Sequence, residues 1–295
     1  MTWITLSICA ALIWAISNLI DKFLLTTWSI RPILPVLAIG IVDLIVSTGI
    51  FVFYPVPLLP VPLLLLAFLA GACYFFNMYL YFYAVKGEDI STVVPLLYLS
   101  PLWVALIAHF FLGESLSTQQ YFSMCLLIAG AILISVNSIK IPRFNKALFA
   151  IVLACFCFAI NQTITKYLLE HTDTLSVFAY IRASAFLAML PLFFINFKLF
   201  SECNRQNGAV PLQIMLGNAG LNLLGLFVFV TAANIGYITL VNALVAVQPF
   251  FVLSFVLLFH YAYPSLLKGS FEKASLLKKV LAILLMFAGV LLIHQ

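Results

Sequence analysis

The stretch ICAALIWAISNLIDKFLL, from Ile8 to Leu25, recurs in altered form as VLACFCFAINQTITKYLL, from Val152 to Leu169. Seven of the eighteen aligned positions are identical, and Lys22 with Lys166 is one of the identical pairs. A duplication inside a strongly apolar chain limits both the architecture and the class of function. Internal repeats in a membrane protein are typical of transporters, which place their binding site where the repeats meet.

The composition of the chain is that of a protein embedded in a membrane. Hydrophobic residues make up 65% of the 295 positions, charged residues 8%, and the mean hydropathy is +1.20. Soluble domains carry roughly a quarter charged residues, because a surface that faces water needs them. The net charge of +5 is small and gives no sign of a nucleic-acid partner. The six cysteines form no CxxC pair and are predicted to be buried free thiols.

Ten apolar stretches are long enough to cross a bilayer, which takes about 20 residues of α-helix. Turn signals separate them, such as the proline-rich run from Tyr54 to Pro62 and the polar run ECNRQNG from Glu202 to Gly208 after the seventh span. The sequence therefore predicts an all-α integral membrane protein with ten transmembrane helices. The predicted spans are residues 3–21, 33–54, 61–84, 90–112, 119–137, 147–168, 174–197, 211–234, 238–260 and 276–293.

The duplication extends over the other predicted helices. The fourth span aligns with the ninth at an offset of 148, which superposes Pro101 on Pro249, and the fifth matches the tenth at five of nine positions. Each repeat then has five spans, and because five is odd the second copy enters the membrane from the opposite side. The sequence predicts two inverted five-helix repeats, 1–138 and 147–295, joined by a loop at 139–146.

Basic residues give the predicted helices an orientation. Twelve of the 14 Lys and Arg residues fall in the odd-numbered connections, whereas Lys166 falls on the other side and Arg182 lies within the seventh span. Basic residues favour the cytoplasmic side of a membrane. We therefore expect both termini on the non-cytoplasmic side of a bacterial cytoplasmic membrane. Lys22 and Glu114 are expected to mark the interface, and Lys166 to snorkel toward it.

Several motifs resemble the EamA-like branch of the drug/metabolite transporter superfamily. They are LIWAISNLIDKFLL in the first span, the proline-containing fourth span that ends in FFLGES (Phe110 to Ser115), and AGA (Ala129 to Ala131) in the fifth. The resemblance covers nearly the whole chain. It implies a fold of five plus five helices and alternating-access transport of small polar organic molecules, often as efflux.

Two charged residues lie within predicted spans, where a charge is costly and needs a local reason. Asp43 is near the middle of the second span, and Arg182 is about a third of the way into the seventh, its counterpart in the other repeat. A buried ion pair that holds the repeats in register is the leading interpretation. Direct substrate binding and proton coupling are the alternatives, and Asp43 is the one carboxylate expected deep within a span.

Polar and aromatic residues on shared helix faces are candidates for lining a site between the repeats. Asn161 and Gln162 in the sixth span align with Ser17 and Asn18 in the first. Amides and aromatic rings suit a zwitterionic, neutral or amine substrate, while hydrogen bonding between helices is the structural alternative. The candidate substrate-binding residues are Trp14, Asn18, Tyr74, Asn77, Tyr98, Asn161, Gln162, Asn218, Asn222, Asn242 and Gln248.

Prolines interrupt the fourth and ninth spans at repeat-matched positions. A proline inside a helix removes one backbone hydrogen bond and bends the helix. Pro101 and Pro249 are therefore the candidate hinges of an alternating-access movement. A static kink that serves packing is the alternative.

The sequence favours a secondary transporter that moves a small polar organic metabolite, such as an amino acid or an amine, by alternating access. No nucleotide-binding motif is present, so the energy comes from a coupling proton, an exchanged solute or downhill flow. No HExxH, GxSxG or paired intramembrane aspartates point to an enzyme, and no metal or other cofactor is predicted. A flippase of a lipid-linked sugar or phospholipid-like substrate is the alternative. A monomer contains both repeats, so a dimer is compatible but not required.

Overall fold

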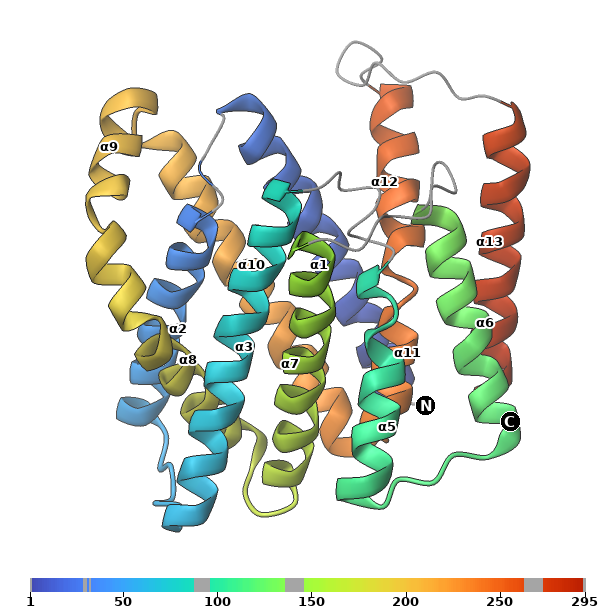
Figure 1. The fold of residues 1–295 in the computed structure, drawn as a ribbon, viewed down its shortest axis with the longest axis horizontal. Helices are drawn as coiled ribbons and strands as arrows, with labels where there is room; N and C mark the ends of the chain where they lie inside the picture. Colours follow the sequence, from blue (N-terminus) through green and yellow to red (C-terminus); the bar gives the residue numbers. More distant parts are fainter. Residues whose placement is uncertain are drawn as a thin grey trace.

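The computed structural model describes residues 2–28, 31, 33–87, 96–135, 146–262 and 273–293. These residues form a bundle of α-helices, and no strand occurs among them (Figure 1). Hydrocarbon offers no hydrogen-bond partners, so a chain this apolar satisfies its backbone groups within helices. The predicted all-α class is confirmed.

Most helices of the described ranges coincide with predicted spans. The first half of the chain forms α1 (Thr2–Thr27), α2 (Ile33–Phe53), α3 (Val61–Gly87), α5 (Ser100–Leu112) and α6 (Thr118–Ser135). The second half forms α7 (Lys146–Leu169), α8 (Thr174–Asn196), α9 (Lys198–Asn207), α10 (Val210–Ile235), α11 (Ile238–Val245), α12 (Gln248–Ala262) and α13 (Lys273–Leu292).

Eight stretches of the described chain are long and apolar enough to cross a membrane. They are found in α1, α2, α3, α6, α7, α8, α10 and the stretch Ile238–Val256 that runs from α11 into α12. Two shorter apolar helices, Ser100–Leu112 and Lys279–Leu292, occupy the positions of the predicted fourth and tenth spans. The protein is an integral multi-pass membrane protein, and the count of ten spans stays a prediction.

Two local expectations were wrong. The polar segment after the seventh span forms the helix α9 rather than a turn, because Phe200 and Cys203, three positions apart, share a face that is buried. The six free cysteines are not uniformly buried, since Cys9 and Cys125 are exposed. The predicted loop at 139–146 lies outside the described residues except for Lys146, as do residues 88–95 and 263–272. The sidedness inferred from basic residues therefore stays a prediction.

Helices from the two halves of the chain pack against one another. Helix α3 lies against α7, and α1 lies against α10. Helix α2 contacts α8, and α6 contacts α13, which stands beside it at the right of Figure 1. Helix α5 contacts α7, and α12 contacts α1. Each of these contacts joins a helix of the first half to one of the second, so the halves share a core.

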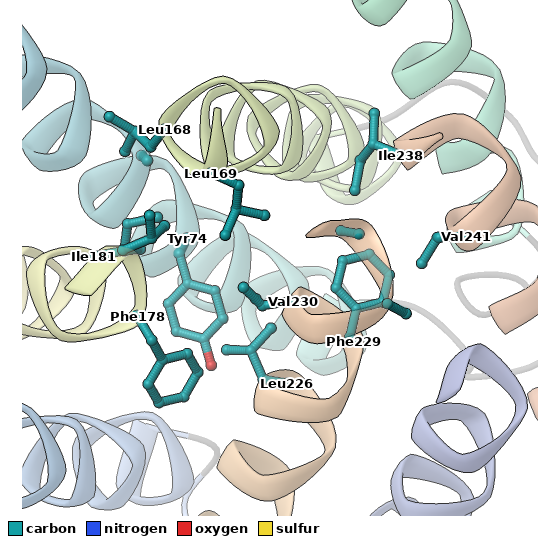
Figure 2. Close-up of a cluster of buried hydrophobic side chains, with 14 of the residues drawn as sticks. Tyr74, Leu168, Leu169, Phe178, Ile181, Leu226, Phe229, Val230, Ile238 and Val241 are labelled. Carbon is teal, nitrogen blue, oxygen red and sulfur yellow. The ribbon is translucent and has the colours of Figure 1, made fainter. Parts of the chain in front are cut away.

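Figure 2 shows part of this core, where the ring of Tyr74 from α3 lies among apolar side chains of α8 and α10. Phe178 from α8 and Leu226 and Val230 from α10 surround it. The core thus brings three helices together at the level of the predicted charged residues.

The ninth span, predicted as one helix over 238–260, is divided at Ala246 and Val247 between α11 and α12. A matching turn precedes α5, and the hydrogen bonds of the two turns lie 148 residues apart, as do Pro101 and Pro249. Each proline is the second residue of its helix, where the missing N–H has no helical partner to lose. The matching backbone N–H to O=C distances are Leu99 to Leu96 3.1 Å, Val247 to Leu244 3.1 Å, Leu102 to Leu99 3.0 Å and Phe250 to Val247 2.9 Å.

Candidate substrate site

Two buried asparagines join α3 to α7. Asn77 donates from Nδ2 to the carbonyl oxygen of Ala154 at 2.9 Å, and Asn161 donates from Nδ2 to that of Ala70 at 2.8 Å. The helices are antiparallel, and each amide bonds the carbonyl seven residues before the other asparagine. These two amides are occupied in helix packing, as the structural alternative to substrate binding expects.

A second polar seam joins α1 to α10. Trp14 donates from Nε1 to the carbonyl oxygen of Asn222 at 3.2 Å, and its ring lies against Phe229 with centroids 5.6 Å apart. Asn218 donates from Nδ2 to the Ser17 carbonyl oxygen at 3.3 Å and to Asp21 Oδ1 at 2.8 Å. The seam therefore contains a carboxylate as well as the predicted amides and tryptophan.

The α1–α10 contact requires a glycine at position 225. A Cβ built on Gly225 would lie 2.8 Å from Trp14 Nε1 and 3.1 Å from Ile13 Cγ2. We expect Gly225→Ala to separate the helices and lower the unfolding free energy by about 1–3 kcal/mol, measured by thermal unfolding in detergent. Gly217→Ala on the same helix is the matched control, because a Cβ there meets nothing within 4 Å. Equal melting temperatures for the two variants would contradict this packing.

The structure places Asp43 and Arg182 together. Arg182 Nη1 lies 3.7 Å from Asp43 Oδ1, and both residues are buried. The guanidinium carbon of Arg182 lies 3.9 Å from the centroid of the Tyr74 ring, within cation–π range. Asp43 Oδ1, the Tyr74 hydroxyl and two nitrogens of Arg182 have no hydrogen-bond partner among the described residues. The charges are paired, yet they keep unused hydrogen-bonding capacity.

The remaining candidates differ in their environments. Gln162 is buried, and both polar atoms of its side chain lack a hydrogen-bond partner among the described residues. Asn242 donates to the carbonyl oxygen of Ile238 in its own helix at 2.9 Å, so its amide serves α11. Tyr98 and Gln248 are half-buried beside the two matching turns. The structure therefore does not gather all the predicted residues at one point.

Some polar residues are accessible on helix faces that point away from lipid. Successive helical residues are about 100° apart, so positions two apart face opposite ways. On α1, the exposed Ile16 marks the lipid side, and the exposed Asn18, two residues later, lies on the opposite side. On α3, the exposed Tyr79 and the half-buried Tyr81 are related in the same way. We call the accessible residues on these inward faces of α1, α3 and α10 the inner polar face, and its members are Asn18, Asp21, Tyr81 and Asn222.

Asp21 is a candidate that the sequence analysis missed. It lies within the helix α1, and its carboxylate faces Asn218 of α10. Its position next to Lys22, at the end of an apolar run, is typical of an interface residue. The i, i+4 spacing from Ser17 is the sequence signal that could have placed it on the same face.

Glu114 joins the α5–α6 connection to the start of α11. Its buried carboxylate accepts hydrogen bonds from the backbone nitrogens of Ile238 at 2.8 Å and Thr239 at 3.2 Å, and from the Thr239 hydroxyl at 2.8 Å. A carboxylate at this place also complements the positive end of the helix dipole. Glu114 is thus a structural contact between the two halves of the chain, and its expected position at the membrane interface stays a prediction.

Lys166 contacts the other side of this junction. Its Nζ donates to the carbonyl oxygens of Ala233 at 2.7 Å and Gly236 at 3.0 Å, at the end of α10. Lys166 thus bonds the neighbouring helix end, and its expected extension toward the membrane interface stays a prediction. We call Glu114, Lys166 and the segment Gly236–Thr239 the polar lock.

Comparison with known proteins gives two family matches and several relatives. Residues 1–136 match the EamA-like transporter family, and residues 90–242, more than half of the chain, match the Triose-phosphate Transporter family. The pseudopaline exporter CntI of Pseudomonas aeruginosa strains UCBPP-PA14 and PAO1 is 28% identical over 141 residues, which is 46% of this chain. The matched region spans about half, 47%, of the length of these relatives.

A solved crystal structure shares the fold. The superposition covers 98% of this chain and 95% of the chain in the solved structure, with a TM-score of 0.71 and 17% sequence identity. At that identity the likeness concerns the fold alone. The two family matches overlap and together cover residues 1–242. The chain therefore belongs to the drug/metabolite transporter superfamily, with regions that match its EamA-like and triose-phosphate transporter families.

Proposed function

We propose that this protein is a secondary transporter that exports a small polar organic metabolite by alternating access between two inverted repeats, 1–138 and 147–295. The inner polar face carries this proposal, because accessible polar side chains on faces turned away from lipid are what a solute path through a membrane needs. The CntI relatives are exporters, which supports the outward direction.

The pairing of helices supports the inverted repeat. A two-fold relation between the repeats exchanges α1 with α7 and α3 with α10, so it turns the α1–α10 contact into α7–α3, and both contacts occur. It also exchanges the turns before α5 and α12, which have the same hydrogen bonds. Two packings related by such a symmetry are close in energy, as a carrier that alternates between them requires.

The two ends of the bundle differ in a way that supports a conformation open to the cytoplasm. The polar lock ties together the even-numbered connections, which the charge rule puts outside. Asp21 and Tyr81 of the inner polar face lie near the odd-numbered connections, which the charge rule puts on the cytoplasmic side. The accessible residues are thus at the cytoplasmic end and the polar lock is at the other. The flippase alternative has less support, because Arg182 is paired with Asp43 and is not free for a lipid phosphate.

Reconstitution in liposomes tests this function. Vesicles loaded with amino acids, amines, nucleosides and sugars are expected to release one class faster when the protein is present, measured by mass spectrometry of the external medium. An imposed pH gradient should change that rate if Asp43 couples a proton, and Asp43→Asn should abolish the response. Scrambling of labelled lipid without release of any solute would replace the proposal with the flippase.

A further inference from the structure

We infer that the facing parts of α1 and α10 recognise an ammonium group, so that the exported metabolite carries a primary amine. This inference rests on the proposed function and adds the chemical class of the substrate. The residues that carry it are Ser17 and Asp21 of α1 and Asn218 of α10.

Neighbouring groups fix the orientation of the Asn218 amide. Its Nδ2 lies 3.3 Å from the Ser17 carbonyl oxygen and 2.8 Å from Asp21 Oδ1, and an ionised carboxylate and a carbonyl can only accept. The reverse orientation would set the amide oxygen against two oxygens. Asn218 Oδ1 is therefore turned away from both, and it is buried without a hydrogen-bond partner among the described residues.

This arrangement offers acceptors rather than donors. The nitrogen and oxygen of one amide are about 2.3 Å apart, so Asn218 Oδ1 lies within about 5 Å of Asp21 Oδ1. Ser17 Oγ, one turn before Asp21, is also buried and has no hydrogen-bond partner in the described part of the chain. An ammonium has three N–H donors and spans acceptors about 5 Å apart with bonds of about 2.8 Å. A carboxylate or phosphate would bring further acceptors and be repelled.

The negative charge of Asp21 favours a cation over a neutral donor. The ion pair found among the described residues joins Arg182 to Asp43, and Lys166 bonds backbone carbonyls at the polar lock. Tyr81 of α3 is half-buried and belongs, like Asp21, to the inner polar face. An aromatic ring near a bound ammonium adds a cation–π contribution.

Asp21 is the accessible part of the site, and the site has no copy at the repeat-equivalent position. Asp21 is half-buried two residues before the exposed Phe23, so its accessible side faces away from lipid. The repeat counterpart of Asp21 is Thr165, whose hydroxyl donates to the Asn161 carbonyl oxygen of its own helix at 2.7 Å. The negative charge therefore has no equivalent in the second repeat.

A matched set of ligands tests the inference on the purified full chain. Tyramine and histamine are each compared with the N-acetyl derivative, putrescine is compared with its N,N′-diacetyl derivative, and 4-hydroxyphenylacetate serves as an anionic probe. We expect at least one amine to raise the melting temperature and to bind at least tenfold more tightly than its acetylated form. Asp21→Asn should remove this preference and Asp21→Glu should restore it, while Glu202→Gln on α9 should leave it unchanged.

The outcomes separate this inference from the proposed function. Retention of the amine preference in a folded Asp21→Asn protein, with the wild-type elution volume in size-exclusion chromatography, overturns the inference. If Asp21→Asn does not fold, Ser17→Ala should weaken amine binding by several-fold, and an unchanged affinity overturns the inference as well. Binding of neutral or anionic probes alone also overturns it, yet solute release from liposomes would still support the transporter. Absence of release for every solute class overturns the proposed function.

Discussion

Arg182→Ala is expected to lower the unfolding free energy by about 3–5 kcal/mol, because it leaves the Asp43 carboxylate buried without its counter-charge. The variant also removes the cation above the Tyr74 ring. Thermal unfolding in detergent measures the loss, with unfolding detected by the reaction of buried thiols such as Cys73 and Cys155 as they become exposed. A melting temperature within one or two degrees of the wild type would contradict the importance of the pair.

Charge exchange is the matched control for this prediction. The single variants Asp43→Arg and Arg182→Asp each place two like charges together, whereas the double variant restores opposite charges at the same two positions. We expect the double variant to be more stable and to transport better than either single variant. If it transports no better than the singles, the pairing has no role beyond packing and direct contact of one charge with substrate is favoured.

Glu114→Ala is expected to open the polar lock. The substitution removes the acceptor of three hydrogen bonds, two of them from the backbone nitrogens of Ile238 and Thr239. Hydrogen bonds to a charged group contribute about 1.5–3 kcal/mol each. We therefore expect the free energy of local opening at the start of α11 to fall by about 2–3 kcal/mol, which is less than the sum of the three bonds. Amide hydrogen exchange at Ile238 and Thr239 should then rise by roughly 30- to 150-fold.

Ser115→Ala is the control for the polar lock, because Ser115 is the exposed neighbour of Glu114. This variant should exchange like the wild type at Ile238 and Thr239. Equal protection in Glu114→Ala and Ser115→Ala would show that other contacts hold the start of α11. Uniformly faster exchange over the whole chain would instead indicate global destabilisation and contradict a local lock.

The sequence predicted the helices well because apolar runs of about 20 residues have few alternatives in a membrane. It could not place the division of the ninth span, since VNALVAVQPF reads as one apolar stretch and the turn forms at Ala246 and Val247. Helix α9 was missed for the opposite reason, because its polar residues obscure two buried positions.

The candidate site was harder to predict because its contacts join distant parts of the chain. Glu114 finds its donors 124 and 125 residues away, and Asp21 meets Asn218 across 197 residues. A single sequence identifies polar residues within a span, but it does not say whether an amide faces a carbonyl or a solute. The sequence therefore assigned Asn77, Asn161 and Asn18 the same role as candidate substrate-binding residues. In the structure, Asn77 and Asn161 instead bond the neighbouring helix.

The reciprocal amide bonds between α3 and α7 bear on how such a carrier would move. Asn77 and Asn161 fasten a helix of the first half to one of the second, and Trp14 and Asn218 do the same for α1 and α10. Helices joined in this way are expected to move together. The bodies that rock in the proposed cycle are then two mixed pairs, α3 with α7 and α1 with α10, rather than the two halves of the sequence. The unit that was duplicated would then differ from the unit that moves. A cross-link between α3 and α7 should be tolerated during transport, whereas one between the two mixed pairs should stop it.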